Sequence, residues 1–151
     1  MKTFKYIAYG SNMNHYQMSY RCPEAKFLGL GMLKSYTLEF RGVADVIPST
    51  ELSDFVPVGI WEITENCLEA LDFYEGYPNL YGREIVTVQD VGGSDVEGIC
   101  YHMNRKGFAP PANSYYTGIM EGYRDCGAIG WVHKLKEARS RAIAEAMGLV
   151  C

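Results

Sequence analysis

The chain has 151 residues and a formal net charge of −4, with 14 Lys and Arg against 18 Asp and Glu. It contains no basic run, which argues against nucleic acid and anionic membranes as partners. The length suits one domain over residues 1–151, large enough to bury about 70% of the surface that the unfolded chain exposes. Twelve tyrosines are unusual for this length. They suit an apolar pocket that can also form hydrogen bonds, although packing on a sheet would account for most of them.

The cellular compartment can be predicted from what the sequence lacks. Met1 to Ile7 has no long apolar core and no cleavage site, so we expect no signal peptide there. No apolar run approaches the length of a membrane span. The five cysteines are scattered and form no CxxC motif, which favours reduced thiols in a cytoplasmic protein. The three histidines lie far apart and show no metal-ligand spacing, so no metal site is expected.

The N-terminal segment predicts a strand followed by a short helix. Residues 4–9 alternate in the manner of a strand and stop at the small polar residues 10–12. Either Asn12 or Asn14 could cap the helix that follows, and Pro23 ends it.

The next segment predicts further strands with short connections. Residues 25–33 and 34–40 both have strand patterns, and the glycines inside the first indicate bulges. Residues 41–54 are less regular, with one short strand near Val46. Residues 55–62 form a further strand.

A helix with clear start and stop signals follows that strand. Thr64 is its expected N-cap, Leu68 and Leu71 its inner face, and Gly76 its C-terminal stop. Glu75 therefore lies at the last helical position or just beyond it. A negative charge there opposes the helix dipole, which disfavours ionisation and raises the carboxyl pKa.

The C-terminal half predicts a hairpin and two helices. Residues 83–90 and 96–102 form the hairpin, and residues 104–111 form a loop. A helix capped by Asn113 follows, and apolar residues at helical spacing from Trp131 predict the last helix. The short gaps favour antiparallel pairing, so we expect an α+β fold with a small, mostly antiparallel, barrel-like mixed sheet flanked by helices.

Two stretches could carry chemistry, and the first is the loop after the first strand. A strand end followed by small residues exposes the backbone amides of Tyr9, Gly10, Ser11 and Asn12 to an anion. Such a loop could hold a carboxylate or a developing oxyanion. An ordinary strand-to-helix turn would give the same local pattern.

The second stretch centres on Glu75, which lies among aromatic residues. A partly buried carboxylate is costly unless it has a partner or a chemical role. Glu75 could act as a general base, or it could pair with Arg83 or Lys26. Asp72, three residues earlier, could form a carboxylate pair with Glu75, but it is expected to face solvent.

Together these stretches resemble a known family. The residues that carry the resemblance are Tyr9-Gly10-Ser11-Asn12-Met13, Met18, Arg21-Cys22-Pro23, Leu71-Asp72, Glu75-Gly76-Tyr77-Pro78 and Tyr81. In this order they are similar to the gamma-glutamylcyclotransferase-like family, which includes the AIG2-like and butirosin-biosynthesis cyclotransferase branches. The resemblance runs from about Ile7 to at least Gly127. The glutathione-specific branch has a first loop that ends in Leu-Met rather than Asn-Met, and this chain resembles it less.

The resemblance implies a small β-barrel flanked by helices and a specific reaction. The substrate would be a small γ-glutamyl compound, and its own α-amine would attack the γ-carbonyl to release 5-oxoproline without a metal or cofactor. The resemblance places the catalytic base on Glu75. It places the substrate-gripping amides on Tyr9, Gly10, Ser11 and Asn12, and pocket tyrosines on Tyr81, Tyr101 and Tyr115, with Tyr116 as the alternative to Tyr115. A non-catalytic protein that binds a small molecule in the same pocket is the competing interpretation.

Overall fold

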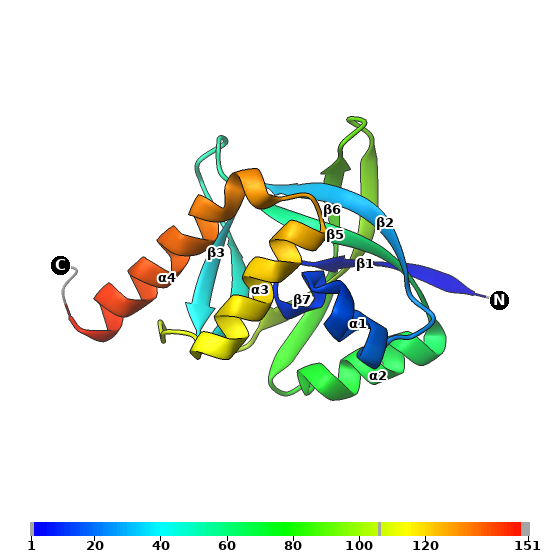
Figure 1. Ribbon diagram of the computed structural model, residues 1–151, viewed down its shortest axis with the longest axis horizontal. Coiled ribbons are helices and arrows are strands. Elements are labelled where there is room, and N and C mark those ends of the chain that lie inside the picture. Colours follow the sequence, from blue (N-terminus) through cyan, green and yellow to red (C-terminus); the bar gives the residue numbers. More distant parts are fainter. Residues whose placement is uncertain (1, 106, 149–151) are drawn as a thin grey trace.

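Five strands close into a barrel, and the helices lie on its outside (Figure 1). The computed structural model describes residues 2–105 and 107–148. In chain order the strands are β1 (Thr3–Ala8), β2 (Lys26–Lys34), β3 (Tyr36–Arg41), β4 (Val43–Pro48), β5 (Phe55–Thr64), β6 (Tyr81–Asp90) and β7 (Asp95–Met103). The helices are η1 (Ser11–Met13), α1 (His15–Arg21), α2 (Glu65–Glu75), α3 (Asn113–Asp125), η2 (Ile129–Trp131) and α4 (Val132–Ala146).

The barrel has the order β1-β5-β2-β6-β7 and is mostly antiparallel. The single parallel contact closes it, where Tyr6 of β1 pairs with Ile99 of β7. The register of β2 on β5 shifts between Phe27 and Gly29, which is the irregularity that the glycines of this strand predict. The α+β class and the mixed barrel flanked by helices are confirmed.

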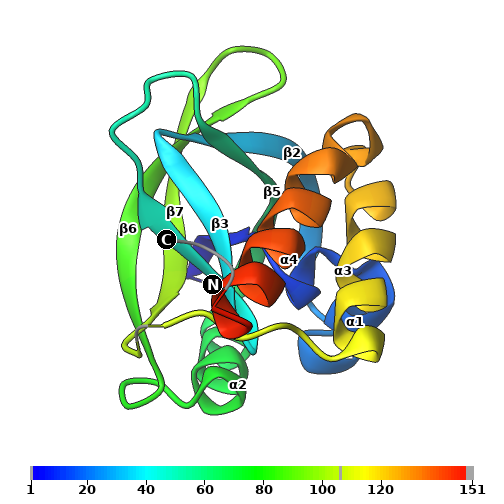
Figure 2. The same cartoon turned by 90° about the vertical axis from the view of Figure 1, so that its left-hand side faces the viewer.

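The hairpin β3–β4 forms a separate two-stranded sheet beside the barrel. The sequence predicted only a short strand near Val46, but β4 pairs with β3 over its whole length, from Tyr36 with Pro48 to Arg41 with Val43. Gly42 is at the turn with a φ of 81°, a conformation that favours glycine, so a residue that suggested irregular structure makes a tight connection. Helix α4 packs along β3 (Figure 2).

Most helix boundaries follow the predicted signals. The Asn14 side chain caps α1, and the Thr64 side chain caps α2. Gly76, with a φ of 66°, ends α2 in the left-handed conformation. The predicted cap of α3 was wrong, because Asn113 is already helical and the capping position is Ala112, which makes no side-chain bond.

The core joins the barrel interior to the inner faces of the helices. Its largest fully buried side chains include Ile7 of β1, Met13, Ile119 and Tyr123 of α3, and Leu135 of α4. Four cysteines are free and buried, while Cys151 lies outside the described residues. Among the residues described, no helix is both long and apolar enough to cross a membrane.

Candidate active site

All eight predicted site residues line one cavity of about 120 Å³ at the end of the barrel. These are Glu75, Tyr9, Gly10, Ser11, Asn12, Tyr81, Tyr101 and Tyr115. The remaining lining residues, which had no assigned role, are Tyr6, Ile7, Val43, Ala44, Tyr74 and Leu80. Segments far apart in the chain therefore meet around one small space.

The loop after β1 offers free backbone donors to this cavity. The chain turns into η1, and the amides of Met13 and Asn14 donate to the carbonyls of Gly10 and Ser11 at 3.0 and 3.1 Å. Within residues 2–105 and 107–148, the amides of Gly10, Ser11 and Asn12 donate to no protein group. Ser11 and Asn12 are buried, so these amides suit an anionic or carbonyl ligand.

Glu75 occupies the end of α2 and faces the same cavity. Burial raises the pKa of its carboxyl group from 4.5 to about 7, and the positive charge of Arg21 opposes part of that rise. The structure describes no ion pair for Glu75; Arg83, one of its two candidate partners, binds Asp72 instead. Burial, rather than the helix dipole invoked from sequence, is the principal cause of the raised pKa. Glu75 is therefore able to gain and lose a proton near neutral pH.

Arg21 connects the loop to the helix that carries Glu75. Its Nη1 donates to Ser11 Oγ at 3.2 Å and to Asn12 Oδ1, and its Nη2 donates to the Tyr74 hydroxyl. The guanidinium also lies over the Tyr74 ring, 3.7 Å from its centre. The only sequence signal for this residue was its place in the Arg21-Cys22-Pro23 motif. Arg21 therefore links the side chains of Ser11 and Asn12 to Tyr74, the residue that precedes Glu75.

Asp72 braces the last turn of α2 against the barrel. Arg83 Nη1 donates to both oxygens of the Asp72 carboxylate, and the Tyr101 hydroxyl donates to Oδ1 at 2.6 Å. The Arg83 guanidinium lies over the Tyr77 ring at 4.3 Å. The expectation that Asp72 faces solvent was wrong, because β6 and β7 bring these partners to it. These contacts hold the Tyr101 hydroxyl and join the last turn of α2, which also carries Glu75, to the barrel.

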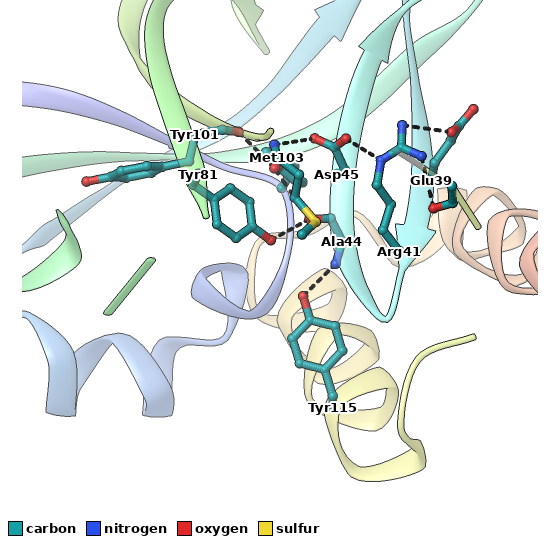
Figure 3. A network of polar contacts seen from close by, with 10 residues as sticks. Glu39, Arg41, Ala44, Asp45, Tyr81, Tyr101, Met103 and Tyr115 are labelled. Atoms are coloured by element: carbon teal, nitrogen blue, oxygen red, sulfur yellow. Dashed lines mark hydrogen bonds and ion pairs between the residues drawn. The ribbon is translucent and has the colours of Figure 1, made fainter. Parts of the chain in front are cut away.

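Tyrosine hydroxyls fix the backbone of Ala44, in the β3–β4 hairpin (Figure 3). Tyr81 donates to the Ala44 carbonyl at 2.9 Å, and the Ala44 amide donates to the Tyr115 hydroxyl at 2.9 Å. Tyr9 donates to the carbonyl of Tyr101 at 2.8 Å. The three predicted pocket tyrosines, Tyr81, Tyr101 and Tyr115, therefore all have hydrogen-bond partners within the protein, and all three line the cavity.

The sequence left open whether Tyr115 or Tyr116 reaches the cavity. The structure places Tyr115 in the cavity wall, where a Cβ on Gly10 would lie 3.5 Å from its hydroxyl. Tyr116 instead packs against Phe40, with the Arg139 guanidinium over its ring. Adjacent helical positions point in different directions, so only one of the two can face the loop.

A buried ionic cluster supports the hairpin behind this wall (Figure 3). Arg41 Nε donates to Asp45 at 2.8 Å, and Arg41 Nη2 lies 3.3 Å from Glu39. Asp45 also accepts a hydrogen bond from the amide of Met103 at 2.9 Å, which joins β4 to β7. The cluster therefore holds Ala44 in its place at the cavity.

Comparisons with known proteins agree with this architecture. The family model described as "Gamma-glutamyl cyclotransferase, AIG2-like" matches residues 6–123. The gamma-glutamylcyclotransferase of Bos taurus is 27% identical over 139 residues, 83% of this chain and 73% of the relative. The gamma-glutamylcyclotransferase of Homo sapiens is 28% identical over 149 residues, 89% of this chain and 78% of the relative.

Solved structures show the same fold. A structure described as "Gamma-glutamyl cyclotransferase" superposes with a TM-score of 0.82 and 26% identity, covering 89% of this chain and 87% of that one. YkqA from Bacillus subtilis shares the fold, with a TM-score of 0.76, 22% identity, and coverage of 93% of this chain and 55% of that one. The chain therefore has the cyclotransferase-like fold. Since the family model spans well over half of its length, the chain belongs to the AIG2-like gamma-glutamyl cyclotransferase family.

Proposed function

We propose that this protein is a γ-glutamyl cyclotransferase, which releases 5-oxoproline and a free amine or amino acid from a small γ-glutamyl compound. One observation supports the proposal above all. A partly buried carboxyl group with a pKa of about 7, Glu75, shares a small cavity with the amides of Gly10, Ser11 and Asn12, which donate to no protein group within residues 2–105 and 107–148. An acid near neutrality beside an oxygen-binding loop is what this intramolecular reaction requires.

The chemistry needs one group that moves protons and a site that folds the substrate. The ionised Glu75 removes a proton from the substrate's α-ammonium, and the resulting amine attacks the γ-carbonyl carbon to form the ring C–N bond. The carbonyl oxygen becomes an oxyanion, and its collapse breaks the original amide bond. Two protons pass in total from the attacking nitrogen to the departing one, and Glu75 can carry each in turn.

The cavity contributes mostly by holding the reacting groups together. Bringing amine and carbonyl into contact in one conformer can supply several kcal/mol, about 7–11 at best. The loop amides would hold the α-carboxylate or the developing oxyanion. The nucleophile belongs to the substrate, so the proposed mechanism assigns no step to a metal or a cofactor. Selectivity for the leaving amine is expected in residues 41–54 and 104–113, and of these Val43 and Ala44 line the cavity.

The direct test is turnover of γ-glutamyl dipeptides and γ-glutamyl amines, with 5-oxoproline as the measured product. Glu75→Gln should lower the rate by about 10²- to 10⁴-fold, the contribution of a positioned proton-transfer group. Glu69→Gln is the matched control, because Glu69 lies on the same helix and is exposed. Calorimetry that shows tight binding of an intact γ-glutamyl compound without product would instead favour the non-catalytic binding protein.

A further inference from the structure

The hydroxyl groups of this cavity have fixed hydrogen-bond directions, because several of their partners can only donate or only accept. The Tyr81 hydroxyl donates to the Ala44 carbonyl, and the Tyr101 hydroxyl donates to the Asp72 carboxylate. Carbonyl and ionised carboxylate oxygens have no hydrogen to give. The hydrogens of Tyr81 and Tyr101 are therefore committed, and their oxygens offer only lone pairs to a ligand.

The Tyr6 hydroxyl is instead a hydrogen-bond donor toward the cavity, and Arg21 sets this direction. A guanidinium has donors only, so the Asn12 atom that faces Arg21 must be the oxygen Oδ1. The Asn12 amide nitrogen then faces Tyr6 and donates to its hydroxyl oxygen at 2.9 Å. The Tyr6 hydroxyl hydrogen therefore stays available to a ligand, because in the described part of the chain the Tyr6 hydroxyl donates to no group.

The remaining contacts of Tyr6 make it a rigid neutral donor. Its strand position is fixed by pairing with Trp61 on one side and Ile99 on the other. Its ring meets the Tyr101 ring edge-on, with centres 5.9 Å apart. Burial, with a further contribution from the nearby Glu75 carboxylate, raises the pKa of Tyr6 well above its usual value. The phenol therefore keeps its proton throughout the neutral range.

These directions divide the cavity into two kinds of surface. The substrate's α-ammonium has only hydrogens to give, so it suits Glu75 and the acceptor oxygens of Tyr81 and Tyr101. The γ-carbonyl oxygen has only lone pairs, and its charge grows when the ring closes, so it needs donors. Tyr6 is such a donor, and it lines the same cavity as the base that must reach the attacking nitrogen.

We propose that the Tyr6 hydroxyl donates a hydrogen bond to the γ-carbonyl oxygen of the substrate, and that Arg21 orients this donor through the side-chain amide of Asn12. The proposal rests on the proposed cyclotransferase function. It makes Tyr6 a further catalytic residue and Arg21 a positioning residue outside the cavity. Tyr6 keeps its proton throughout, so no bond to hydrogen is broken at this residue.

Two substitutions test the donor role in different ways. Tyr6→Phe removes the hydrogen and keeps the ring. Asn12→Asp keeps the shape and the contact to Arg21, but the carboxylate accepts the Tyr6 hydrogen and turns it away from the cavity. Each should lower kcat by about 10²-fold with little change in KM, as expected for the loss of an oxyanion donor. Tyr20→Phe, which removes an exposed hydroxyl bonded to Tyr16, should leave kcat within about twofold.

The double variant Tyr6→Phe with Asn12→Asp distinguishes a hydrogen-bond donor from a purely structural role of Tyr6. In the double variant the second change should add less than about threefold, since both remove the same hydrogen bond. The new charge of Asn12→Asp acts on Glu75 as well, so kcat is compared on the pH plateau of each variant. An active wild type whose Tyr6→Phe and Asn12→Asp variants keep their kcat would overturn the inference and leave the proposed function intact. A wild type that releases no 5-oxoproline would instead overturn the function.

Neutron diffraction tests the hydrogen directions independently of turnover. The expected map has deuterium on the Asn12 nitrogen facing Tyr6, and the Tyr6 deuterium directed into the cavity. A Tyr6 deuterium that points at Asn12 would refute the proposed orientation, whatever the activity of the variants.

Discussion

The partly buried Glu75 should make the protein less stable at pH 8 than at pH 4, and Glu75→Gln should remove this loss of stability. In the unfolded chain Glu75 ionises near pH 4.5, while in the folded protein burial raises its pKa to about 7. Between these values the folded state holds a proton that the unfolded state has lost. The free energy of unfolding therefore falls as pH rises from about 4.5 to 7, and below that range Glu75 makes no difference.

The size of this effect follows from the shift. Each pKa unit corresponds to about 1.4 kcal/mol, so ionised Glu75 costs at most about 3 kcal/mol at pH 8. The carboxyl group is only half-buried and retains some solvent screening, so we expect a gain of about 1–3 kcal/mol for Glu75→Gln. A domain of this size changes its Tm by about 2–4 °C per kcal/mol, which corresponds to a rise of about 2–12 °C.

Thermal denaturation of wild type and Glu75→Gln at pH 8 and pH 4 measures this difference. The variant should be the more stable at pH 8, and the gain should vanish at pH 4, where neither form carries a charge at residue 75. Any effect of the introduced side-chain amide on stability is the same at both pH values, so it cancels in the difference between the gains at pH 8 and pH 4. Glu69→Gln changes an exposed charge on the same helix and should show no comparable gain. A Glu75→Gln variant no more stable than wild type at pH 8 would show that Glu75 is not held in a desolvated site.

Two further predictions follow from the cavity and its support. Asp45→Ala leaves the buried Arg41 without its closest partner, and we expect a loss of about 3–5 kcal/mol in chemical denaturation; a loss under about 1 kcal/mol would mean that Glu39 suffices. The rate kcat/KM should rise with pH through about 7, because the base must be ionised to accept a proton, and a profile flat across that range would exclude Glu75 as the titrating base.

Features with local causes could be predicted from the sequence. Thr64 and Gly76 fix the ends of α2 through their own backbone and side-chain geometry, and they also place Glu75 at the last helical position. The alternation of residues 4–9 predicted β1 and the loop after it. The resemblance to the family then predicted that the loop and Glu75 share one site, although they are more than sixty residues apart in the chain.

Features that depend on contacts between distant segments could not be predicted. Arg21 reaches Tyr74 across 53 residues, and Asp72 acquires its partners only when the barrel closes. Both side chains are polar residues on short helices, for which exposure to solvent is the usual expectation. The hydrogen-bond direction of the Tyr6 hydroxyl is set by two bonds in series, from Arg21 to Asn12 and from Asn12 to Tyr6. No periodicity or composition encodes such a direction.

In the proposed cyclisation, Glu75 moves the protons between the attacking and the departing nitrogen. The most direct measurement is the release of 5-oxoproline from a series of γ-glutamyl compounds by wild type and by Glu75→Gln, with folding of the variant verified by its thermal transition. We expect product from at least one compound with the wild type, and a rate lower by at least about 10²-fold with the folded variant. Near-normal turnover by folded Glu75→Gln would contradict this role of Glu75.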